Sequence, residues 1–506
     1  MQQGTLPFHY AEENESTGMT ALSGLAAYLD LAGAARLGES VRRHVGVREG
    51  TQGWTDAQMV MSLVMLNLSG GESVDVLRLL ERDEGLGRVL LAGESHKMRR
   101  ADRRAQRNRW RRERRRVVPS PTAVFRYLDN FHDEAEEARR RPGKAFIPAA
   151  NGALRGLRRV NSDLVGFAGG HSGHTRATLD MDATLVETNK RQASYCYKKY
   201  KAYQPLTAYW HEADLVVHSE FRDGNVNAGY EQLRVLKESL EQLPAGVSRV
   251  MMRSDSAGYQ KDLLRYCAEG RDERFGVIEF CVGVDVVAEF KAAVKEVEED
   301  GWHDLHGTEE EHRERTGQQY AEVCYVTDWT GYSKNSPDYR FIAIREPLRN
   351  PQMFDMEELR VPTMQMPDGG WYKVTGVVTN RDLPGDELIR WYRQRCGKGE
   401  EVHAVLKEDL AGGRLPSGKF GANAAWWAIV VLAFNLNSAM KRLVLGGEWV
   451  SRRLKAVRFG IINLAGRVIR HARRLIIRLA RGHPSYDLLI SAHQRIVALA
   501  NAPPRA

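Results

Sequence analysis

The chain has 506 residues, of which 42% are hydrophobic and 27% charged, and its net charge is +9. This composition excludes a fibrous or largely disordered chain, and the length predicts about three globular domains. The positive charge favours a polyanionic partner, most often nucleic acid, although a basic surface that only aids solubility is the alternative.

The cysteines and the apolar segments indicate in which cellular compartment the protein is expected. The five cysteines are widely spaced and form no CxxC pair, which argues against a disulfide framework or a zinc cluster and fits a reducing cytosol. The first residues lack the basic-then-apolar pattern of a signal peptide. The most apolar stretch, Ala424 to Leu436, is short for a bilayer span, so we expect a buried helix and no membrane insertion.

The N-terminal part is predicted to be helical. Apolar residues recur at spacings of three and four from about residue 19 to 90. Thr55 or Asp56 is expected to cap one helix, and Gly70 to end it. Pro119 precedes a further helix, capped by Ser120 or Thr122, which weakly resembles the reading helix of a helix-turn-helix.

An arginine-rich segment, residues 97–116, follows the first helices. It holds twelve Lys and Arg residues against two acids, a net charge of +10. Guanidinium groups pair with phosphate oxygens at two points, and neutralised phosphates release counterions, so the segment predicts DNA or RNA contact. Within it we name Arg103, Arg107 and Arg111 as DNA-binding candidates. A solvated basic loop is the alternative.

From about residue 175 the pattern changes to strands alternating with helices, which predicts an α/β sheet. Short β-rich runs between about 290 and 385 indicate an insertion, and the tail from about 424 is expected to be helical and basic. Lys198 and Lys199 lie among tyrosines, an arrangement that suits a DNA-facing loop, although a solvated turn is equally compatible.

Three acids stand where a sheet enzyme places catalytic carboxylates. Asp182 and Asp255 end predicted strands, and Glu400 lies in a helical stretch after the insertion. Sites in open α/β sheets form at the carboxyl ends of strands, and carboxylates suit Mg²⁺. Any one of these acids alone is more simply a turn or surface residue. As a set they predict a two-metal site for phosphoryl transfer.

The set resembles the DDE transposases of insertion sequences, specifically the insertion-sequence 1380 family within the insertion-sequence 4-like clan. The segments that carry the resemblance are LDMDATLVE, AYQPLTAYWHE, EFRDGNVNAG, MMRSDSAGYQ and WYRQRCGKGEEVHAVLKEDL, in that order between about residues 120 and 480. The resemblance implies an α/β catalytic core of ribonuclease-H-like type with a β-rich insertion, flanked by all-α N- and C-terminal regions.

The implied domain organisation is as follows. We expect a helical N-terminal DNA-binding region over 1–125, a helical linker over 126–175, a ribonuclease-H-like core over 176–290 and 386–445, a β-rich insertion over 291–385, and a basic helical C-terminal region over 446–506.

The resemblance carries the catalytic and metal-binding triad onto Asp182, Asp255 and Glu400, with two Mg²⁺ ions for which Mn²⁺ can substitute. Asp182 is preferred over Asp180 because the related pattern places Asp two residues before Thr, here Thr184. Strand alternation points Asp180 and Asp182 to the same face, so Asp180 stays open as the ligand.

The wider clan also has a signature of Tyr, Arg, Glu and Lys, which Tyr392, Arg395, Glu400 and Lys407 match. Four residues separate Arg395 from Glu400 where the signature has three, which leaves Glu401 open. The resemblance assigns Tyr392, Arg395 and Lys407 to DNA phosphates near the cleaved end. Core packing or surface salt bridges are the alternatives.

The predicted function is magnesium-dependent cleavage at transposon ends followed by strand transfer into target DNA. The implied partners are terminal inverted repeats and target DNA, bound by a homodimer or larger synaptic complex in the cytoplasm, associated with the nucleoid. The alternative is a catalytically inactive, sequence-specific DNA-binding protein, such as a repressor or relic. A structure-selective nuclease on the same core is a third reading.

Overall fold

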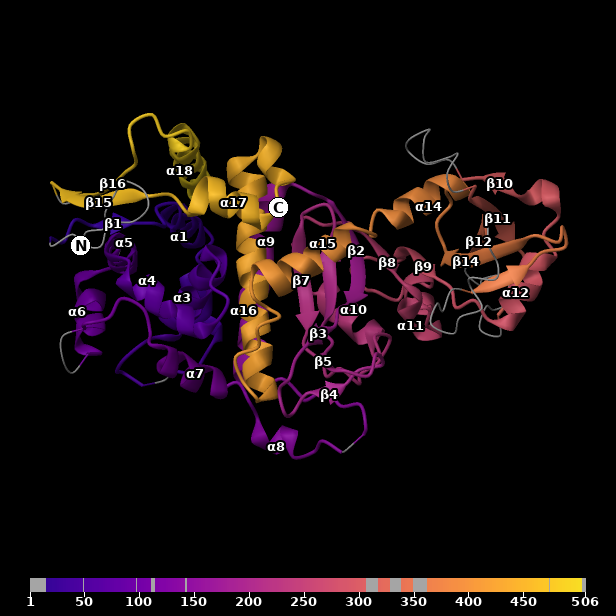
Figure 1. Ribbon diagram of the computed structural model, residues 1–506, viewed down its shortest axis with the longest axis horizontal. Helices are drawn as coiled ribbons and strands as arrows, with labels where there is room; N and C mark the ends of the chain where they lie inside the picture. The colour runs from indigo at the N-terminus through magenta and orange to yellow at the C-terminus, as the bar shows by residue number, and fades with distance from the viewer. Residues whose placement is uncertain are drawn as a thin grey trace, which may run out of the picture. The chain divides into compact units, whose positions relative to one another are not determined.

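A computed structural model describes residues 15–48, 50–96, 98–110, 114–141, 143–305, 317–327, 338–348, 362–472 and 474–502. The chain divides into two compact units (Figure 1). The first unit comprises Met1–Asp133, Ala150–Leu164 and Val405–Pro503, and the second comprises Glu134–Ala149, Val165–Ala404 and Pro504–Ala506.

The first unit is mainly helical. Its helices are α1 (Leu25–Ala34), α2 (Leu37–His44), α3 (Asp56–Ser69), η1 (Val74–Val76), α4 (Leu77–Arg82), α5 (Glu84–Ser95), α6 (Arg100–Asn108), α7 (Pro121–Asp129), η5 (Val405–Asp409), α16 (Phe420–Ala439), η6 (Met440–Leu445), η7 (Gly447–Val450), α17 (Leu454–Val457), η8 (Arg458–Ile462) and α18 (Tyr486–Asn501). Helix α9 (Gly152–Ser172) begins in this unit and ends in the second.

Helix α16 forms the centre of the first unit. It is buried along nearly its whole length and packs against α1, α3 and α7. The helical stretch Phe420–Leu445 is long and apolar enough to cross a membrane, and 83% of its most apolar window is buried inside the protein. The apolar stretch from Ala424 to Leu436 thus belongs to a longer helix than its own length indicates, and its burial inside the protein confirms the expected buried helix. The sequence prediction placed residues 386–445 in the catalytic core, whereas the structure packs α16 into the helical unit.

The expected all-α termini are corrected by a small sheet. Strands β1 (Met19–Thr20), β15 (Gly466–His471) and β16 (Arg474–Arg478) form a three-stranded antiparallel sheet, so the C-terminal region 446–506 is not purely helical. The physical reason is the period-two alternation of Gly466–His471, in which exposed Arg467 lies between buried Gly466 and Val468. The abundance of arginine concealed this alternation.

The second unit is built on a ten-stranded sheet. Its strands are β2 (Arg176–Ala183), β6 (Leu206–Trp210), β7 (Leu215–Glu220), β8 (Arg249–Ser254), β9 (Glu279–Gly283), β10 (His303–Asp304), β11 (Gln319–Val323), β12 (Arg340–Pro347), β13 (Thr363–Gln365) and β14 (Trp371–Thr379). The strand order is β10-β11-β12-β14-β9-β8-β2-β6-β7, with β13 paired to β14. Strands β9, β8 and β2 are parallel, and the other pairings are antiparallel. A mixed α/β fold is thus confirmed.

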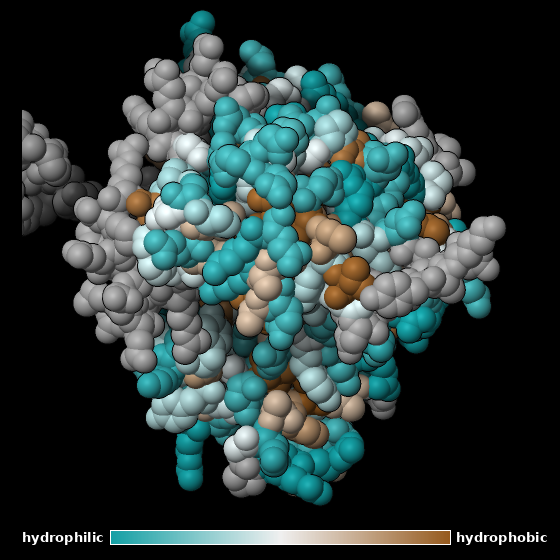
Figure 2. Space-filling model, turned by 90° about the vertical axis from the view of Figure 1, so that its right-hand side faces the viewer, coloured by the Kyte–Doolittle hydropathy of each residue, from teal (hydrophilic) through white to brown (hydrophobic). Residues whose placement is uncertain are grey.

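Helices and a second small sheet complete this unit. The helices are α8 (Glu134–Glu137), α10 (Gln232–Leu240), η2 (Ser256–Gly258), α11 (Lys261–Ala268), α12 (Ala288–Lys295), η3 (Glu299–Gly301), α14 (Gly385–Arg393) and α15 (Lys398–Ala404). Strands β3 (Val186–Glu187), β4 (Ser194–Tyr195) and β5 (Lys201–Tyr203) form the small sheet between β2 and β6 in the chain. The face shown in Figure 2 is mostly hydrophilic, with its apolar residues in small scattered groups.

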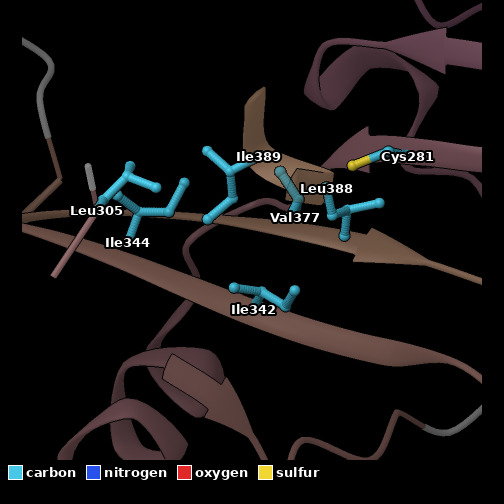
Figure 3. Close-up of a cluster of buried hydrophobic side chains, with 7 residues drawn as sticks. All are labelled: Cys281, Leu305, Ile342, Ile344, Val377, Leu388 and Ile389. Carbon is cyan, nitrogen blue, oxygen red and sulfur yellow. The ribbon is translucent and has the colours of Figure 1, made fainter. Parts of the chain in front are cut away.

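The strands between residues 291 and 385 extend the main sheet. The end of β14 pairs antiparallel with β9, Val377 opposite Gly283 and Thr379 opposite Cys281. Helix α14 then packs on this extension through Leu388 and Ile389, which lie in a buried cluster (Figure 3). Its other members are Cys281, Leu305, Ile342, Ile344 and Val377. The extension therefore supplies the apolar surface that fixes the helix carrying Tyr392.

Local signals in the sequence predicted several helix ends. Thr55 caps α3 through a capping box, in which Gln58 N–H donates to Thr55 Oγ1 at 3.2 Å and Thr55 N–H donates to Gln58 Oε1 at 2.9 Å. Gly70 ends the same helix with φ of 96°, a left-handed conformation that glycine adopts without strain. Ser120, rather than Thr122, caps α7.

Replacing the cap of α3 provides a test of this local structure. Thr55→Ala removes the acceptor for the Gln58 N–H and is expected to lower the stability of the first unit by about 1 kcal/mol. Thermal unfolding followed by circular dichroism measures the change. Thr55→Ser keeps the hydroxyl and should remain close to wild type; equal losses for both variants would contradict the capping role.

Candidate active site

Two acids lie at the carboxyl ends of adjacent parallel strands. Met181 of β2 is paired with Ser254 of β8, so Asp182 and Asp255, one residue further on, reach the same edge of the sheet. Asp255 also caps η2, because its Oδ1 accepts the Ala257 N–H at 3.1 Å. The structure thus brings together two of the three acids predicted from sequence.

The electrostatics of Asp182 reflect this position. Burial raises the pKa of Asp182 to about 6; Arg395 opposes the shift, and Asp255 adds to it by like-charge repulsion. Arg395 Nη2 lies 3.9 Å from Asp182 Oδ1. The pKa of Arg395 is in turn raised, since attraction to Tyr392, Asp182 and Asp255 outweighs the opposing effect of burial. The edge therefore concentrates negative charge that one guanidinium partly offsets.

The neighbouring acid Asp180 is held by a different interaction. Arg253 Nε donates to Asp180 Oδ1 at 2.6 Å and Arg253 Nη2 to Asp180 Oδ2 at 2.9 Å. Both side chains are buried, and Arg253 Nη1 also donates to the carbonyl oxygen of Trp391. His211 Nδ1 lies 3.4 Å from Asp180 Oδ2. Asp180 is thus engaged in an ion pair that links β2, β8 and α14.

Arg253 was missed by the sequence reasoning. The signal was present, because a charged residue interrupts the apolar strand segment VMMRSD. A buried charge requires a partner, and Asp180 lies directly opposite Arg253 in the parallel register. That register cannot be read from the sequence.

Tyr392 and Arg395 approach the same edge from α14 and the turn that follows it. Tyr392 Oη donates to Ser254 O at 3.2 Å, and the Arg395 guanidinium lies 5.7 Å from the Tyr392 ring centroid. Gly283 of β9 permits the approach, since a Cβ there would lie 3.2 Å from Tyr392 Oη and 3.0 Å from Ser256 N. Both residues thus contact the strand ends that carry the acids.

The extra residue between Arg395 and Glu400 is absorbed in a turn. Helix α14 ends at Arg393 and α15 begins at Lys398, with Gly397 at a φ of +72° between them. Such a backbone conformation favours glycine. The one-residue difference from the signature therefore falls in the turn between the two helices.

Helix α15 brings its first turn close to Asp182. A Cβ on Gly399 would lie 3.7 Å from Asp182 Oδ2, and His403 Nδ1 lies 3.8 Å from the same oxygen. Glu400 is exposed and stands three residues before His403, so the two share a helix face. Glu401 instead pairs with Lys398 at 3.3 Å. His403 is a neighbour of the acids that the sequence reasoning did not single out.

The three acids do not form a closed metal cluster. Within the described parts of the chain, no group of three or more His, Cys, Asp or Glu side chains is arranged to hold a metal ion. The seven-residue spacing of Glu400 and Lys407 would place both on one face of a regular α-helix. Lys407 lies in the π-helix η5, which widens the turn, so that relation does not hold here.

Comparison with known proteins identifies the family. A family model described as Transposase DDE domain group 1 matches residues 54–501. The chain belongs to this family of DDE transposases. The family's activity is DNA transposition and recombination, which involve DNA cleavage and strand transfer.

Other comparisons with this transposase are more distant. The chain is similar to the solved structure entitled "Cryo-EM structure of piggyBac transposase synaptic complex with hairpin DNA", with a TM-score of 0.44 and 11% identity. The alignment covers 97% of this chain and 85% of that chain. No curated protein matches the sequence of the transposase.

The arginine-rich segment of the transposase divides into two parts. Helix α6 has no buried residue, and its arginines at 100, 103, 104 and 107 recur at spacings of three and four, which places Arg103 and Arg107 on one exposed face. Arg109 and Arg114 are structural. Arg109 donates to Gly50 O and Gly53 O, and Arg114 lies 4.4 Å from the Trp54 ring centroid and bonds Glu94. Arg111 lies outside the described residues.

Lys198 and Lys199 lie in the turn between β4 and β5, and both are exposed. Lys198 Nζ is 5.8 Å from the ring centroid of Tyr197, which is itself 69% exposed. Lys199 has a φ of 65°. The turn therefore presents cations beside an accessible aromatic ring, and DNA contact through it remains a prediction.

The different environments of Asp180 and Asp182 predict different effects of the same substitution. Asp180→Asn leaves the buried Arg253 without a charged partner and is expected to lower stability by about 3–5 kcal/mol. Asp182→Asn is the matched control on the same strand and should cause no comparable loss. Thermal and urea unfolding of both variants measure the difference; equal stabilities would contradict the assignment of Asp180 to the ion pair.

The raised pKa of Asp182 predicts a pH dependence in the metal-free protein. The folded state holds this proton more tightly than the unfolded state, so the associated stability is fully present below about pH 4 and is lost as pH rises through about 6. Asp182→Asn does not ionise, so its melting temperature relative to wild type should rise between pH 4 and 7. Unfolding scans in EDTA measure this; a constant difference would contradict the shift.

Proposed function

We propose that this transposase cleaves transposon ends and transfers the freed strands into target DNA, using Asp182, Asp255 and Glu400 to bind two Mg²⁺ ions for which Mn²⁺ can substitute. The observation that carries the proposal is the convergence of Asp182 and Asp255 at the carboxyl edge of parallel strands, in a chain of the DDE family. We further propose membership of the insertion-sequence 1380 family, on the sequence segments given above.

The order of the central strands supports a ribonuclease-H-like core. Strands β7-β6-β2-β8-β9 are neighbours in the sheet, and β6 runs antiparallel to both strands beside it while the other four run in one direction. This order and these directions are those of a ribonuclease-H-like sheet. The first two acids then stand at the ends of its first and fourth strands, β2 and β8.

The donor set fits divalent cations that prefer oxygen ligands. Asp182 and Asp255 provide carboxylates at one edge. Burial, with a smaller contribution from repulsion by Asp255, raises the pKa of Asp182, so a cation bound there would favour its ionised form. Glu400 is favoured over Glu401 because it shares a helix face with His403, which lies near Asp182, whereas Glu401 pairs with Lys398. Bound Mg²⁺ would activate the attacking hydroxyl and stabilise the leaving oxygen of an in-line displacement.

The chain's own residues would position the DNA and the carboxylates. Arg395, beside Asp182, presents a guanidinium suited to a phosphate next to the scissile bond. Tyr392 keeps that region ordered through its bond to Ser254 O. Lys407, the exposed arginines of α6 and the lysines of the β4–β5 turn are proposed contacts with the remaining DNA backbone.

The proposed partners are terminal inverted repeats and target DNA. We propose that a homodimer or larger synaptic complex assembles on them in the cytoplasm, associated with the nucleoid. In this arrangement the helical N-terminal region recognises the element ends. The exposed arginine face of α6 supplies sequence-independent affinity by neutralising phosphates.

A nicking assay tests the catalytic assignment. Duplex DNA carrying the repeats that flank the reading frame is incubated with full-length protein and Mg²⁺. Asp182→Asn, Asp255→Asn and Glu400→Gln are each expected to reduce nicking by about a thousandfold, since the metals supply several kcal/mol of transition-state stabilisation. EDTA should abolish nicking, and Mg²⁺ or Mn²⁺ should restore it.

Glu401→Gln is the control, since Glu401 is paired with Lys398 on the other side of the helix. It should nick nearly as well as wild type, and gel shifts should show that all variants still bind DNA. Equal nicking by wild type and Asp255→Asn would refute the site. If the wild-type protein binds the DNA without nicking it, the result would favour the alternative of a catalytically inactive DNA-binding protein. If it nicks the DNA without strand transfer, the result would favour the structure-selective nuclease.

A further inference from the structure

The C-terminal β-hairpin lies in a segment without acidic residues. Residues 449–486 contain ten Lys and Arg and no Asp or Glu. The arginines before the hairpin are engaged by the protein, as shown by Arg453, which pairs with Asp409, and Arg458, which donates to Leu68 O. Among the residues that the structure describes, no arginine of β15 or β16 forms an ion pair with an acid. Their charge is therefore available to an external anion.

The hairpin has one face on the protein and one face exposed. Val468 is fully buried, β15 contacts α5, and Arg88 of α5 donates to Val468 O at 2.8 Å. Figure 1 shows β15 and β16 beside β1 and α5. The opposite face carries three cross-strand pairs: Arg467–Arg478, Ile469–Ile476 and His471–Arg474. The exposed face thus places cations at both ends and two isoleucines between them.

The pairing of Arg467 with Arg478 places like charges directly opposite each other. Such a pair destabilises an isolated sheet. Both residues are exposed, and Arg467 Nε donates to Thr17 O at 2.9 Å, which orients the guanidinium. A row of phosphates beside the pair would convert this repulsion into binding energy by neutralising both charges.

The dimensions of the hairpin match a DNA groove. His471 follows Arg467 by four positions, which corresponds to about 14 Å along an antiparallel strand. The major groove of B-DNA is about 12 Å wide and admits a two-stranded β-ribbon, whereas the minor groove is about 6 Å wide. Cations at the two ends of the ribbon can then meet the phosphates on both sides of the groove.

We propose that the β15–β16 ribbon inserts into the major groove of duplex DNA, with Arg467, Arg478 and Arg474 on the flanking phosphates and Ile469 and Ile476 facing the base edges. Apolar side chains in this position can contact thymine methyl groups. The proposal rests on the transposase function proposed above and adds a DNA-contacting element that lies outside the arginine-rich segment and the catalytic edge.

The test measures DNA affinity against salt concentration with the full-length protein and a 40-base-pair duplex. The double variant Arg467→Ala/Arg478→Ala is expected to reduce the slope of log K against log salt by about 2, because each phosphate contact contributes about 0.9. Arg467→Lys/Arg478→Lys should retain the slope. Arg42→Ala/Arg43→Ala removes two exposed arginines of α2 in the same unit and should leave the slope unchanged.

The groove is tested with competing ligands. Methyl green, a major-groove ligand, should weaken binding of wild type more than of the double alanine variant, whereas netropsin, a minor-groove ligand, should affect both equally. An unchanged slope in the double alanine variant would overturn the inference, as would netropsin competition specific to wild type. If the double alanine variant loses self-association in the absence of DNA while its salt slope is unchanged, the ribbon would be a protein–protein interface, and this result would also overturn the inference.

Asp255→Asn separates this inference from the proposed function. It should lose nicking but keep the wild-type salt slope. Failure of wild type to bind the duplex would count against the DNA-processing function itself. If the wild-type protein nicks and binds DNA normally but the double alanine variant keeps the wild-type salt slope, only the proposed DNA contact of the β15–β16 ribbon would be refuted.

Discussion

The arrangement of the sheet edge that carries Asp182 and Asp255 depends on the buried ion pair between Asp180 and Arg253. The Arg253 side chain is fully inaccessible to solvent, so its charge is tolerated only because Asp180 and the Trp391 carbonyl accept its hydrogen bonds. The guanidinium also lies 5.1 Å from the ring centroid of Trp391. One side chain on β8 thereby fixes the register of β2 and holds the end of α14 against the sheet.

The same strand uses two acids in different ways because their distances from the strand end differ. Asp180 lies inside the sheet and is neutralised by a guanidinium at hydrogen-bonding distance. Asp182 lies at the edge, with Arg395 at 3.9 Å and the repelling Asp255 nearby. The first acid contributes to the fold, whereas burial and, to a smaller extent, repulsion by Asp255 raise the pKa of the second. Positive charge at this edge would favour the ionised form of Asp182.

The helix α15 completes this edge only in part. Its first turn approaches Asp182 through Gly399 and His403, and Glu400 stands exposed on the same side of the helix. Among the residues that the structure describes, no three His, Cys, Asp or Glu side chains are grouped to hold a metal ion.

The sequence by itself determined the strand ends that carry Asp182 and Asp255, the glycine that ends α3 and the α/β character, because these depend on local patterns of apolar, charged and turn residues. The tertiary structure alone decided that Asp180 pairs with Arg253, that Arg109 and Arg114 serve the fold while Arg103 and Arg107 remain exposed, and that β14 joins the insertion to the main sheet. Each of these outcomes depends on which distant strand or helix supplies the partner, and local periodicity carries no information about that partner.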